Sequence, residues 1–437
     1  MRMPFTRRMR TIPRLLRVTA AVAATVLAVA SGTASAQVKP ALVLPTHDPF
    51  YTYTGSKPLS QIAPGTMLKK RAITLTIAGL TVPYQADQVL YRTNGEQSQP
   101  TVTVTTIIKP LASLLGTKIV SFQTAYDALG AECDPSYTLR GGNPGDTLSQ
   151  AEAAEIAVYV TAGYTVTVPD YEGETLDWGA GQESGYSTLD SIRATESYLG
   201  APASTQVGML GYSGGSIATE WASELAPKYA PGLDIIGAAS GGVPVDFAQN
   251  LSYINGDQDW AGVIPAVLVT LSRSFGVNLN KYLDSYGQKI LKQVQGECIA
   301  SFATAYPGLT FAQLVKVQYQ NPFGVPVLVR ILNHLIMGSA PGHPQVPELL
   351  GVGNADGTGD GIMVAADVQA LAHEYCQQGV PVSFDEYSGL EHTEAAVPFE
   401  AHALTFLTSL FLGLPPSNGC SSIGPGASIA PLPMPHR

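Results

Sequence analysis

The chain has 437 residues, of which 13% are charged and 45% hydrophobic, and its formal net charge is −10. Binding to nucleic acid or to an anionic membrane would require basic patches, so this acidic composition argues against both partners. The apolar content suffices for a large core, and an α/β protein with insertions can reach this length as one unit.

Residues 1–36 are predicted to be a cleaved signal peptide. They carry six arginines and no acidic residue, with an apolar run at 18–30 and the small residues Ala-Ser-Ala at 34–36. The apolar run is too short to span a bilayer comfortably, which favours a secreted protein over one with a transmembrane anchor. Cleavage after Ala36 would take the formal net charge from −10 to −16, because all six arginines leave with the leader. The arginine pair at 7–8 leaves the choice between general and twin-arginine export open.

The four cysteines of an exported chain predict two disulfides with three possible connectivities. We favour Cys133–Cys298 and Cys376–Cys420, because the second pair flanks the last strand–helix unit and the first pair lies in the middle of the chain. The chain has no CxxC or CxxH pair, so no metal site is expected from its cysteines.

Four strands are expected after the leader, in runs rich in β-branched residues: 72–78, 86–93, 101–110 and 118–123. From about residue 146 helices and strands alternate. The expected helices are 147–161, 187–199 and 216–229, and the expected strands are 165–169, 205–210 and 234–239. This alternation predicts βαβ units and a mostly parallel central sheet, with ligands at the carboxyl ends of its strands.

The next expected strand is 346–352, so roughly a hundred residues separate two consecutive strands, far more than a crossover needs. Apolar helical pieces occur in this stretch at 264–272, 282–294, 311–319 and 325–336. Residues 244–345 are therefore predicted to form an inserted helical cap, either a lid over an apolar substrate or a structural insertion. The core would comprise 37–243 and 346–420, ending with helix 365–378, strand 380–386 and helix 401–412. Residues 421–437 have the composition of a flexible tail.

The sequence Gly211-Tyr212-Ser213-Gly214-Gly215 has the G-x-S-x-G spacing of a nucleophile elbow. Glycines two residues to either side of the serine let neighbouring backbone approach closely. In a chain with 44 glycines the motif alone is weak, and it could be a turn without chemistry. Its place between an expected strand and an expected helix is the context of the nucleophilic serine of an α/β-hydrolase.

Such a serine needs a histidine base and a carboxylate, in the chain order serine, acid, histidine. His392 lies in the loop directly after the last expected strand, and this loop could swing its imidazole over Ser213. The other histidines fall in the N-terminal extension, the insertion, two helices and the tail: His47, His334, His343, His373, His402 and His436. The acid is expected after strand 346–352, where Asp360 is our choice because apolar residues follow it, and Asp356 is the alternative. This loop faintly resembles a calcium site, but Ala365 stands where that site requires glutamate.

Acyl transfer also needs N–H donors for the tetrahedral oxyanion. The amide of Gly214, the residue after the nucleophile, is one expected donor. The second is expected from the loop that follows strand 165–169, with the amide of Asp170 as the candidate. Asp170 could instead be a turn or capping residue.

These motifs together resemble the secretory lipase family typified by fungal lipase A. The resemblance is carried by GYSGG, VPDYEG, GNADGTGDGIMV and LEHTEAAV in this order, and it runs over roughly residues 48–420. It implies an α/β-hydrolase fold with a helical cap and cofactor-free hydrolysis of carboxylic esters, including triacylglycerols. It also implies Ser213 as nucleophile, Asp360 as acid, His392 as base, and Asp170 and Gly214 as oxyanion donors. One departure is that residues 361–364 (GIMV) follow the acid, where the family commonly has an acidic or polar residue and then Val-Pro.

The sequence therefore predicts a secreted, monomeric serine hydrolase that acts on ester or lipid substrates, a lipase that can work at a lipid–water interface. Two alternatives stay open. One is a short-chain or polyester esterase with an open cleft, and the other is an exported binding protein that keeps the fold without turnover.

Overall fold

The computed structural model describes residues 42–113, 116–340 and 342–435. The predicted signal peptide and its cleavage site after Ala36 lie outside the described residues. Within the described part of the chain, no helix is both long enough and apolar enough to cross a membrane.

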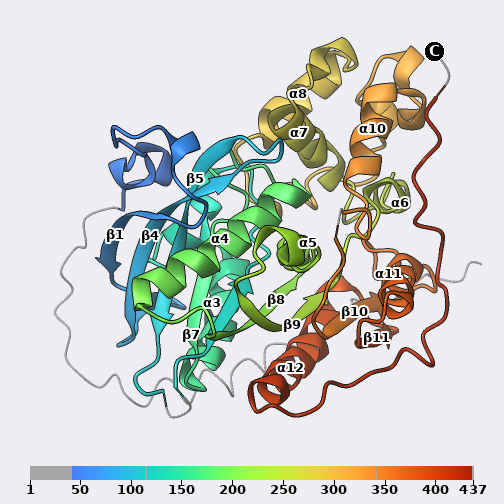
Figure 1. The fold of residues 1–437 in the computed structure, drawn as a ribbon. Helices are drawn as coiled ribbons and strands as arrows, with labels where there is room; N and C mark the ends of the chain where they lie inside the picture. The colour runs from blue at the N-terminus through green and yellow to red at the C-terminus, as the bar shows by residue number, and fades with distance from the viewer. Residues whose placement is uncertain (1–41, 114–115, 341, 436–437) are drawn as a thin grey trace, which may run out of the picture. The chain divides into compact units, whose positions relative to one another are not determined.

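A nine-stranded sheet forms the centre of the molecule, in the strand order β1-β4-β5-β7-β6-β8-β9-β10-β11 (Figure 1). The amino-terminal strands pair antiparallel: β1 (Met67–Ile73), β4 (Gln85–Asn94) and β5 (Pro100–Lys109), with β5 also antiparallel to β7 (Thr165–Pro169). From β7 onward the pairing is parallel through β6 (Ile119–Gln123), β8 (Gln206–Tyr212), β9 (Asp234–Gly241), β10 (Glu348–Asn354) and β11 (Val382–Ser388). The short strands β2 (Thr76–Ile77) and β3 (Leu80–Thr81) form a separate ribbon. The sheet is mostly parallel, as predicted.

Helices cover both faces of the sheet. Strands β6 and β7 are buried along their whole length, which is typical of parallel strands covered on two sides. One face packs against α3 (Thr147–Thr161) and α12 (His392–Phe411). The other packs against α4 (Gly181–Leu199), α5 (Gly214–Tyr229) and α11 (Ala365–Gln377). A short helix, α2 (Pro135–Thr138), follows β6.

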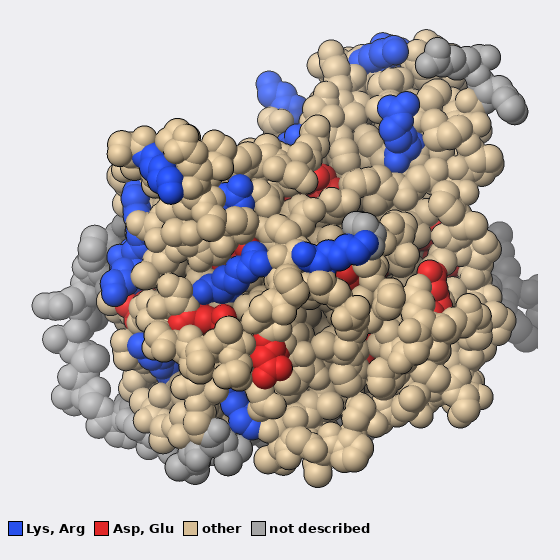
Figure 2. All heavy atoms as spheres, in the orientation of Figure 1, with Lys and Arg blue, Asp and Glu red and all other residues tan. Residues whose placement is uncertain are grey.

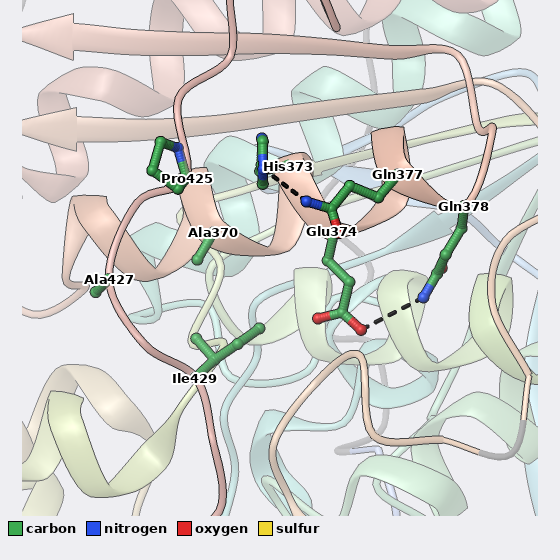
Figure 3. Close-up of a pocket in the computed structure, with 8 residues that line it drawn as sticks. All are labelled: Ala370, His373, Glu374, Gln377, Gln378, Pro425, Ala427 and Ile429. Carbon is green, nitrogen blue, oxygen red and sulfur yellow. Dashed lines mark hydrogen bonds between the residues drawn. The ribbon is translucent and has the colours of Figure 1, made fainter.

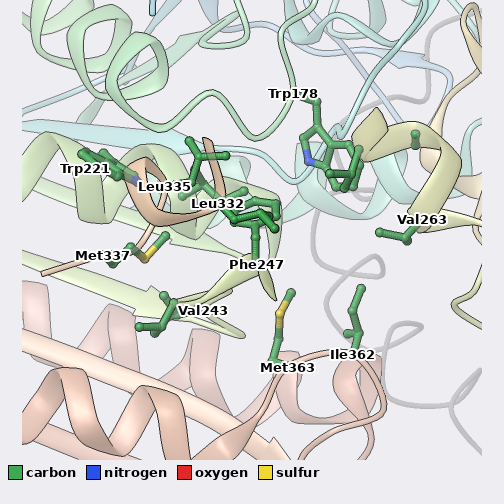
Figure 4. Packing of buried hydrophobic residues seen from close by; sticks show 14 of the residues in the cluster. Trp178, Trp221, Val243, Phe247, Val263, Leu332, Leu335, Met337, Ile362 and Met363 are labelled. Carbon is green, nitrogen blue, oxygen red and sulfur yellow. The ribbon is translucent and has the colours of Figure 1, made fainter. Parts of the chain in front are cut away.

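The stretch between β9 and β10 is helical, and it shares its apolar core with the sheet layer. It contains α6 (Phe247–Tyr253), α7 (Val263–Phe275), α8 (Ser285–Val294), α9 (Ile299–Phe302) and α10 (Pro326–His334). Figure 4 shows how side chains from this insertion, such as Phe247 and Leu332, pack with Trp178 and Trp221 of the core. Because one hydrophobic cluster spans both parts, the insertion is anchored rather than loosely appended.

One predicted helix of the insertion is wrong. Residues 311–319 form two 3₁₀ turns, Phe311–Gln313 and Val317–Tyr319, instead of a helix. The reason is a tertiary contact, since Val315 in the middle of this stretch pairs as a β-bridge with Leu283. Backbone groups that pair across such a bridge cannot make helical hydrogen bonds at the same time.

The two disulfides are Cys133–Cys298 and Cys376–Cys420, which are the pairs favoured from the sequence. The first joins the loop after β6 to the start of α9 in the insertion. Next to it, Ala128 pairs with Cys298 as a β-bridge, and the amide of Leu129 donates to the carbonyl of Glu297 over 2.9 Å. The loop after β6 is therefore fixed to the insertion by covalent and hydrogen bonds.

Residues 421–437, which the sequence predicts to be a flexible tail, contact the rest of the chain over their described part, 421–435. This segment runs in an extended conformation past α11, where Pro425, Ala427 and Ile429 line a groove with His373 and Glu374 of that helix (Figure 3). The Ala427 amide donates to the Ala366 carbonyl over 2.9 Å. Further along, Asn333 of α10 bonds both the amide and the carbonyl of Leu432, at 2.7 and 2.9 Å. Composition did not reveal this, because the anchoring bonds use backbone groups that nearly every residue type has.

Charged side chains are few and dispersed on the face shown in Figure 2, as a charged fraction of 13% implies. On that face the lysines and arginines lie among uncharged residues rather than in one continuous patch.

Candidate active site

Ser213 lies in a strained turn between β8 and α5. Its φ is 53° and its ψ is −123°, a conformation that non-glycine residues rarely adopt. The turn also demands small neighbours. A Cβ on Gly211 would lie 2.3 Å from the carbonyl oxygen of Gly215, and a Cβ on Gly215 would lie 2.0 Å from that of Gln123. The strand, turn and helix expected from the G-x-S-x-G spacing are therefore present. Close backbone contacts explain why residues 211 and 215 are glycines.

The structure brings Ser213, His392 and Asp360 together in one chain of contacts. The Nε2 atom of His392 lies 2.8 Å from the Oγ of Ser213, and its Nδ1 lies 2.7 Å from the Oδ2 of Asp360. Asp360 is fully buried and His392 is 4% exposed. In this arrangement an imidazole can take the proton of a serine hydroxyl while a carboxylate stabilises the resulting cation.

Backbone hydrogen bonds hold the carboxylate of Asp360 in place. Its Oδ1 accepts from the amides of Ile362 and Met363 at 3.0 and 2.7 Å, which leaves Oδ2 for the histidine. The backbone carbonyl of Asp360 also accepts from the amide of His392 over 2.9 Å. The GIMV sequence that departs from the family pattern thus supplies two of the donors that orient the acid.

His392 is the first residue of α12 and not part of a loop, which corrects the prediction. The helix starts nine residues before the expected position 401 and continues through Pro398. Glu391 and Glu394 form a capping box that closes its first turn. The Tyr212 hydroxyl donates to the His392 carbonyl over 2.6 Å. The imidazole of His392 is consequently held by a capped helix start, and His402 lies inside the same helix.

Asp356, the alternative acid, lies away from His392. It is exposed and accepts from the amides of Thr358 and Gly359 at 2.7 and 3.0 Å and from the hydroxyl of Tyr253 at 3.0 Å. These backbone hydrogen bonds lower the pKa of its carboxyl below the ordinary value. Among the described residues no group of three His, Cys, Asp or Glu side chains is placed to hold a metal ion.

Exchanging each aspartate for alanine separates the two candidates. We expect Asp360→Ala to lower kcat on p-nitrophenyl butyrate about 10³- to 10⁴-fold, because the imidazole loses the group that orients it. The matched variant Asp356→Ala should change kcat less than about threefold, since it removes only turn hydrogen bonds at the surface. Equal small losses in both variants would contradict the assignment of Asp360.

The structure overturns Asp170 as an oxyanion donor. Its amide donates to the carbonyl of Val104 over 2.8 Å, which extends the pairing of β5 with β7. Its carboxyl accepts from the amide of Ser136 over 2.9 Å and from the hydroxyl of that serine, and burial raises the pKa of the carboxyl to about 7. The residue therefore stabilises the core, and its N–H is not free for a substrate.

Asp127 occupies the position that the prediction assigned to Asp170. Strand β6, not β7, lies beside β8, with Gln123 paired to Gly211, so the loop after β6 flanks the elbow. A Cβ on Gly214 would lie 1.5 Å from the Oδ1 of Asp127, which shows how closely the two residues approach. In the described part of the chain neither the Asp127 amide nor the Gly214 amide donates to a backbone carbonyl. The residues after strand 118–123 could have been found from the sequence only if the strand order had been known.

A small cavity of about 30 Å³ lies in front of Ser213 and is lined almost entirely by apolar side chains. It is bounded by the elbow, by the loop after β10 and by helices of the insertion. The apolar residues that line it include Trp178, Phe247, Leu251, Ile254, Val263, Val267, Ile299, Ile362 and Met363. Several of these are labelled in Figure 4. The apolar lining next to this serine matches the chemistry of a hydrocarbon chain.

The sequence model of secretory lipases matches residues 143–419 of this chain. The chain belongs to the secretory lipase family. "Secreted triacylglycerol lipase LIP4" of Malassezia globosa is 30% identical over 85% of this chain and 80% of its own length. A Mycobacterium tuberculosis protein named "Probable inactive lipase" is 31% identical over 85% of this chain and 84% of its own. The X-ray structure of Candida antarctica lipase A aligns with a TM-score of 0.81 and 28% identity, over 90% of this chain and 92% of that one.

The expected α/β-hydrolase fold of this secretory lipase is thereby confirmed, as is its membership of a family of carboxylic ester hydrolases. The part matched by the family model includes Ser213, Asp360 and His392. It leaves out Asp127 and Cys133, which lie on the loop after β6. That this loop lies beside the elbow follows from the pairing of β6 with β8 in the structure.

Proposed function

We propose that this secretory lipase hydrolyses carboxylic esters, including triacylglycerols, with Ser213 as nucleophile, His392 as base and Asp360 as acid. The observation that carries the proposal is the unbroken contact from the Ser213 Oγ through the imidazole to the buried Asp360. The name of the Malassezia globosa relative supports the choice of triacylglycerols.

In the first half of the reaction, Nε2 of His392 takes the proton of Ser213 while the Oγ attacks the ester carbonyl carbon. The tetrahedral oxyanion accepts hydrogen bonds from the amides of Gly214 and Asp127. The intermediate collapses, the C–O bond to the alcohol breaks, and His392 returns the proton to the leaving alcohol. Ser213 is left as an acyl ester.

In the second half, His392 takes a proton from a water molecule whose oxygen attacks the acyl carbon. The same two amides hold the second oxyanion. Its collapse breaks the bond to the Ser213 Oγ, the imidazolium gives the proton back to that oxygen, and the carboxylic acid leaves. One ester and one water thus give one acid and one alcohol, and the enzyme is restored.

The apolar cavity beside Ser213 is the proposed site of the acyl chain, and residues 244–345 are the proposed cap over it. We further propose that the protein is secreted after cleavage behind Ala36 and acts as a monomer. A water-excluding apolar site strengthens the hydrogen bonds to the oxyanion, because fewer solvent dipoles compete for them.

Labelling with a fluorophosphonate tests whether Ser213 is an activated nucleophile. We expect the purified wild-type protein to be labelled once, at Ser213, and the Ser213→Ala variant to remain unlabelled. No labelling of the wild type would contradict the proposal and favour a binding protein without turnover. The "Probable inactive lipase" of Mycobacterium tuberculosis is the observation that keeps this alternative open.

A chain-length series then separates a lipase from a short-chain esterase. We expect hydrolysis of emulsified long-chain triacylglycerol as well as tributyrin. Turnover confined to soluble esters of short acids would contradict the lipase assignment and leave ester hydrolysis intact.

A further inference from the structure

One oxygen of the Asp127 carboxyl group, Oδ1, lies at the candidate active site without a hydrogen-bond partner among the described residues. Asp127 is 2% exposed and lines the same cavity as Ser213 and Gly214. Its Oδ1 has no partner within the described residues. A buried polar atom without a partner is costly, and in a native structure it calls for an explanation.

We propose that the side chain of Asp127 is a third oxyanion donor, a neutral carboxylic acid whose O–H hydrogen-bonds the oxyanion together with the amides of Gly214 and Asp127. The inference rests on the proposed function, since it assigns a further role within the same reaction. The missing partner of Oδ1 is then the oxyanion of the substrate, which exists only during catalysis.

The position of the carboxyl relative to the elbow fits this role. A Cβ on Gly214 would lie 1.5 Å from Oδ1 and 2.8 Å from Oδ2 of Asp127. That Cβ would itself lie about 1.5 Å from the Cα of Gly214, the length of a carbon–carbon bond. The Oδ1 atom of Asp127 is therefore within about 3 Å of this Cα. The amide that follows the nucleophile is one bond from that carbon. An oxyanion that accepts from this amide forms beside the Asp127 carboxyl.

An ionised carboxylate at this place would repel the oxyanion, so the role requires the protonated form. Burial raises the pKa of Asp127 to about 7, and His392, the indole of Trp178 and the aspartate's own amide act in the opposite direction. The ionisable groups around it are the acids Glu152 on α3 and Glu172 after β7, the phenol of Tyr171, and His392 on α12. A carboxylic acid that stays neutral in an apolar site is an effective hydrogen-bond donor to an oxyanion.

The proton remains on Asp127 throughout the reaction, since the side chain donates a hydrogen bond and transfers nothing. Below a pH of about 7 the carboxyl is neutral and donates. As the pH rises through that value the proton is lost, the donor becomes a negative acceptor, and kcat falls. We therefore expect kcat to decline above a pH of about 7 because Asp127 loses its proton.

Two substitutions of Asp127, compared by automatic titration of tributyrin hydrolysis from pH 5 to pH 9, test the proposal. Asp127→Asn keeps a donor of similar shape that cannot ionise, and asparagine tolerates the φ of 39° at this position. We expect its kcat at pH 6 to stay within about tenfold of the wild type and its decline above pH 7 to disappear. Asp127→Leu keeps the backbone amide but removes the side-chain donor, so its kcat at pH 6 should fall about 10²- to 10³-fold.

Fluorophosphonate labelling of Ser213 and the melting temperature of each variant control for misfolding. An Asp127→Asn enzyme with the wild-type decline above pH 7 would overturn the inference, and so would a folded Asp127→Leu enzyme with wild-type kcat at pH 6. Absence of labelling in the wild type would instead refute the proposed function itself, so the two failures are distinguishable.

Discussion

Substituting Ser213 by alanine is expected to lower kcat on p-nitrophenyl butyrate by at least about 10⁴-fold. The change removes the oxygen that attacks the ester, while the two amide donors and the apolar cavity stay in place. The residual rate is expected to come from these remaining features, because removing one member of such a group leaves some catalysis over water. KM should change little, since the acyl site is intact.

Ser216→Ala is the matched control for that experiment. Ser216 lies one turn further along α5, and its hydroxyl donates to the backbone carbonyl of Ser213 over 2.5 Å. Loss of this hydrogen bond should lower the free energy of unfolding slightly. It should leave kcat within about tenfold of the wild-type value, because the nucleophile and its partners remain. A Ser213→Ala enzyme with wild-type turnover, measured on protein free of other esterases, would show that the elbow is not the reactive site.

Removal of the Cys133–Cys298 disulfide is expected to lower both the free energy of unfolding and kcat. The bond closes a loop of 165 residues, for which the loss of stability should be about 2–5 kcal/mol in the Cys133→Ala/Cys298→Ala variant. The bond also anchors the loop that carries Asp127, so a looser loop should misplace the oxyanion donors and reduce kcat about tenfold or more. Thermal unfolding and turnover of tributyrin measure the two effects.

The second disulfide gives a control of matched chemistry. Cys376–Cys420 closes a loop with a sequence separation of 44 and ties α11 to the segment after α12, away from the elbow. The Cys376→Ala/Cys420→Ala variant should be destabilised without a comparable fall in kcat. If both variants lost stability but kept the wild-type kcat, the first disulfide would have no anchoring role in catalysis.

Much of the fold could be predicted because the relevant signals are local. The predicted helix 147–161 and strand 165–169 coincide with α3 and β7. Asp146 caps the helix start through two amides, and a glycine with positive φ follows the helix end, so both boundaries are encoded in neighbouring residues. Ser213, Asp360 and His392 could be selected because each follows a strand whose carboxyl end lies at one edge of the sheet.

Asp127, the proposed second oxyanion donor, could not be predicted in the same way. The choice between Asp127 and Asp170 depends on whether β6 or β7 lies beside the elbow strand, and in the sheet these two strands appear in the reverse of their chain order. Strand order is a tertiary property that no local pattern reports. The early start of α12 was missed for a related reason, since its capping box and the contact of Tyr212 with His392 outweigh the proline inside the helix.

The extended segment between Ala427 and Leu432 limits how far α10 can move away from α11. One end is bonded to Ala366 at the start of α11, and the other is held on both sides by Asn333 of α10. Six residues in a fully extended chain span at most about 20 Å. While both ends stay bonded, the length of this segment limits the distance between Asn333 of α10 and Ala366 of α11. Any displacement of α10 is therefore bounded while both ends stay bonded, and a proteolytic cut in this short segment would remove the bound without breaking a single helix or strand.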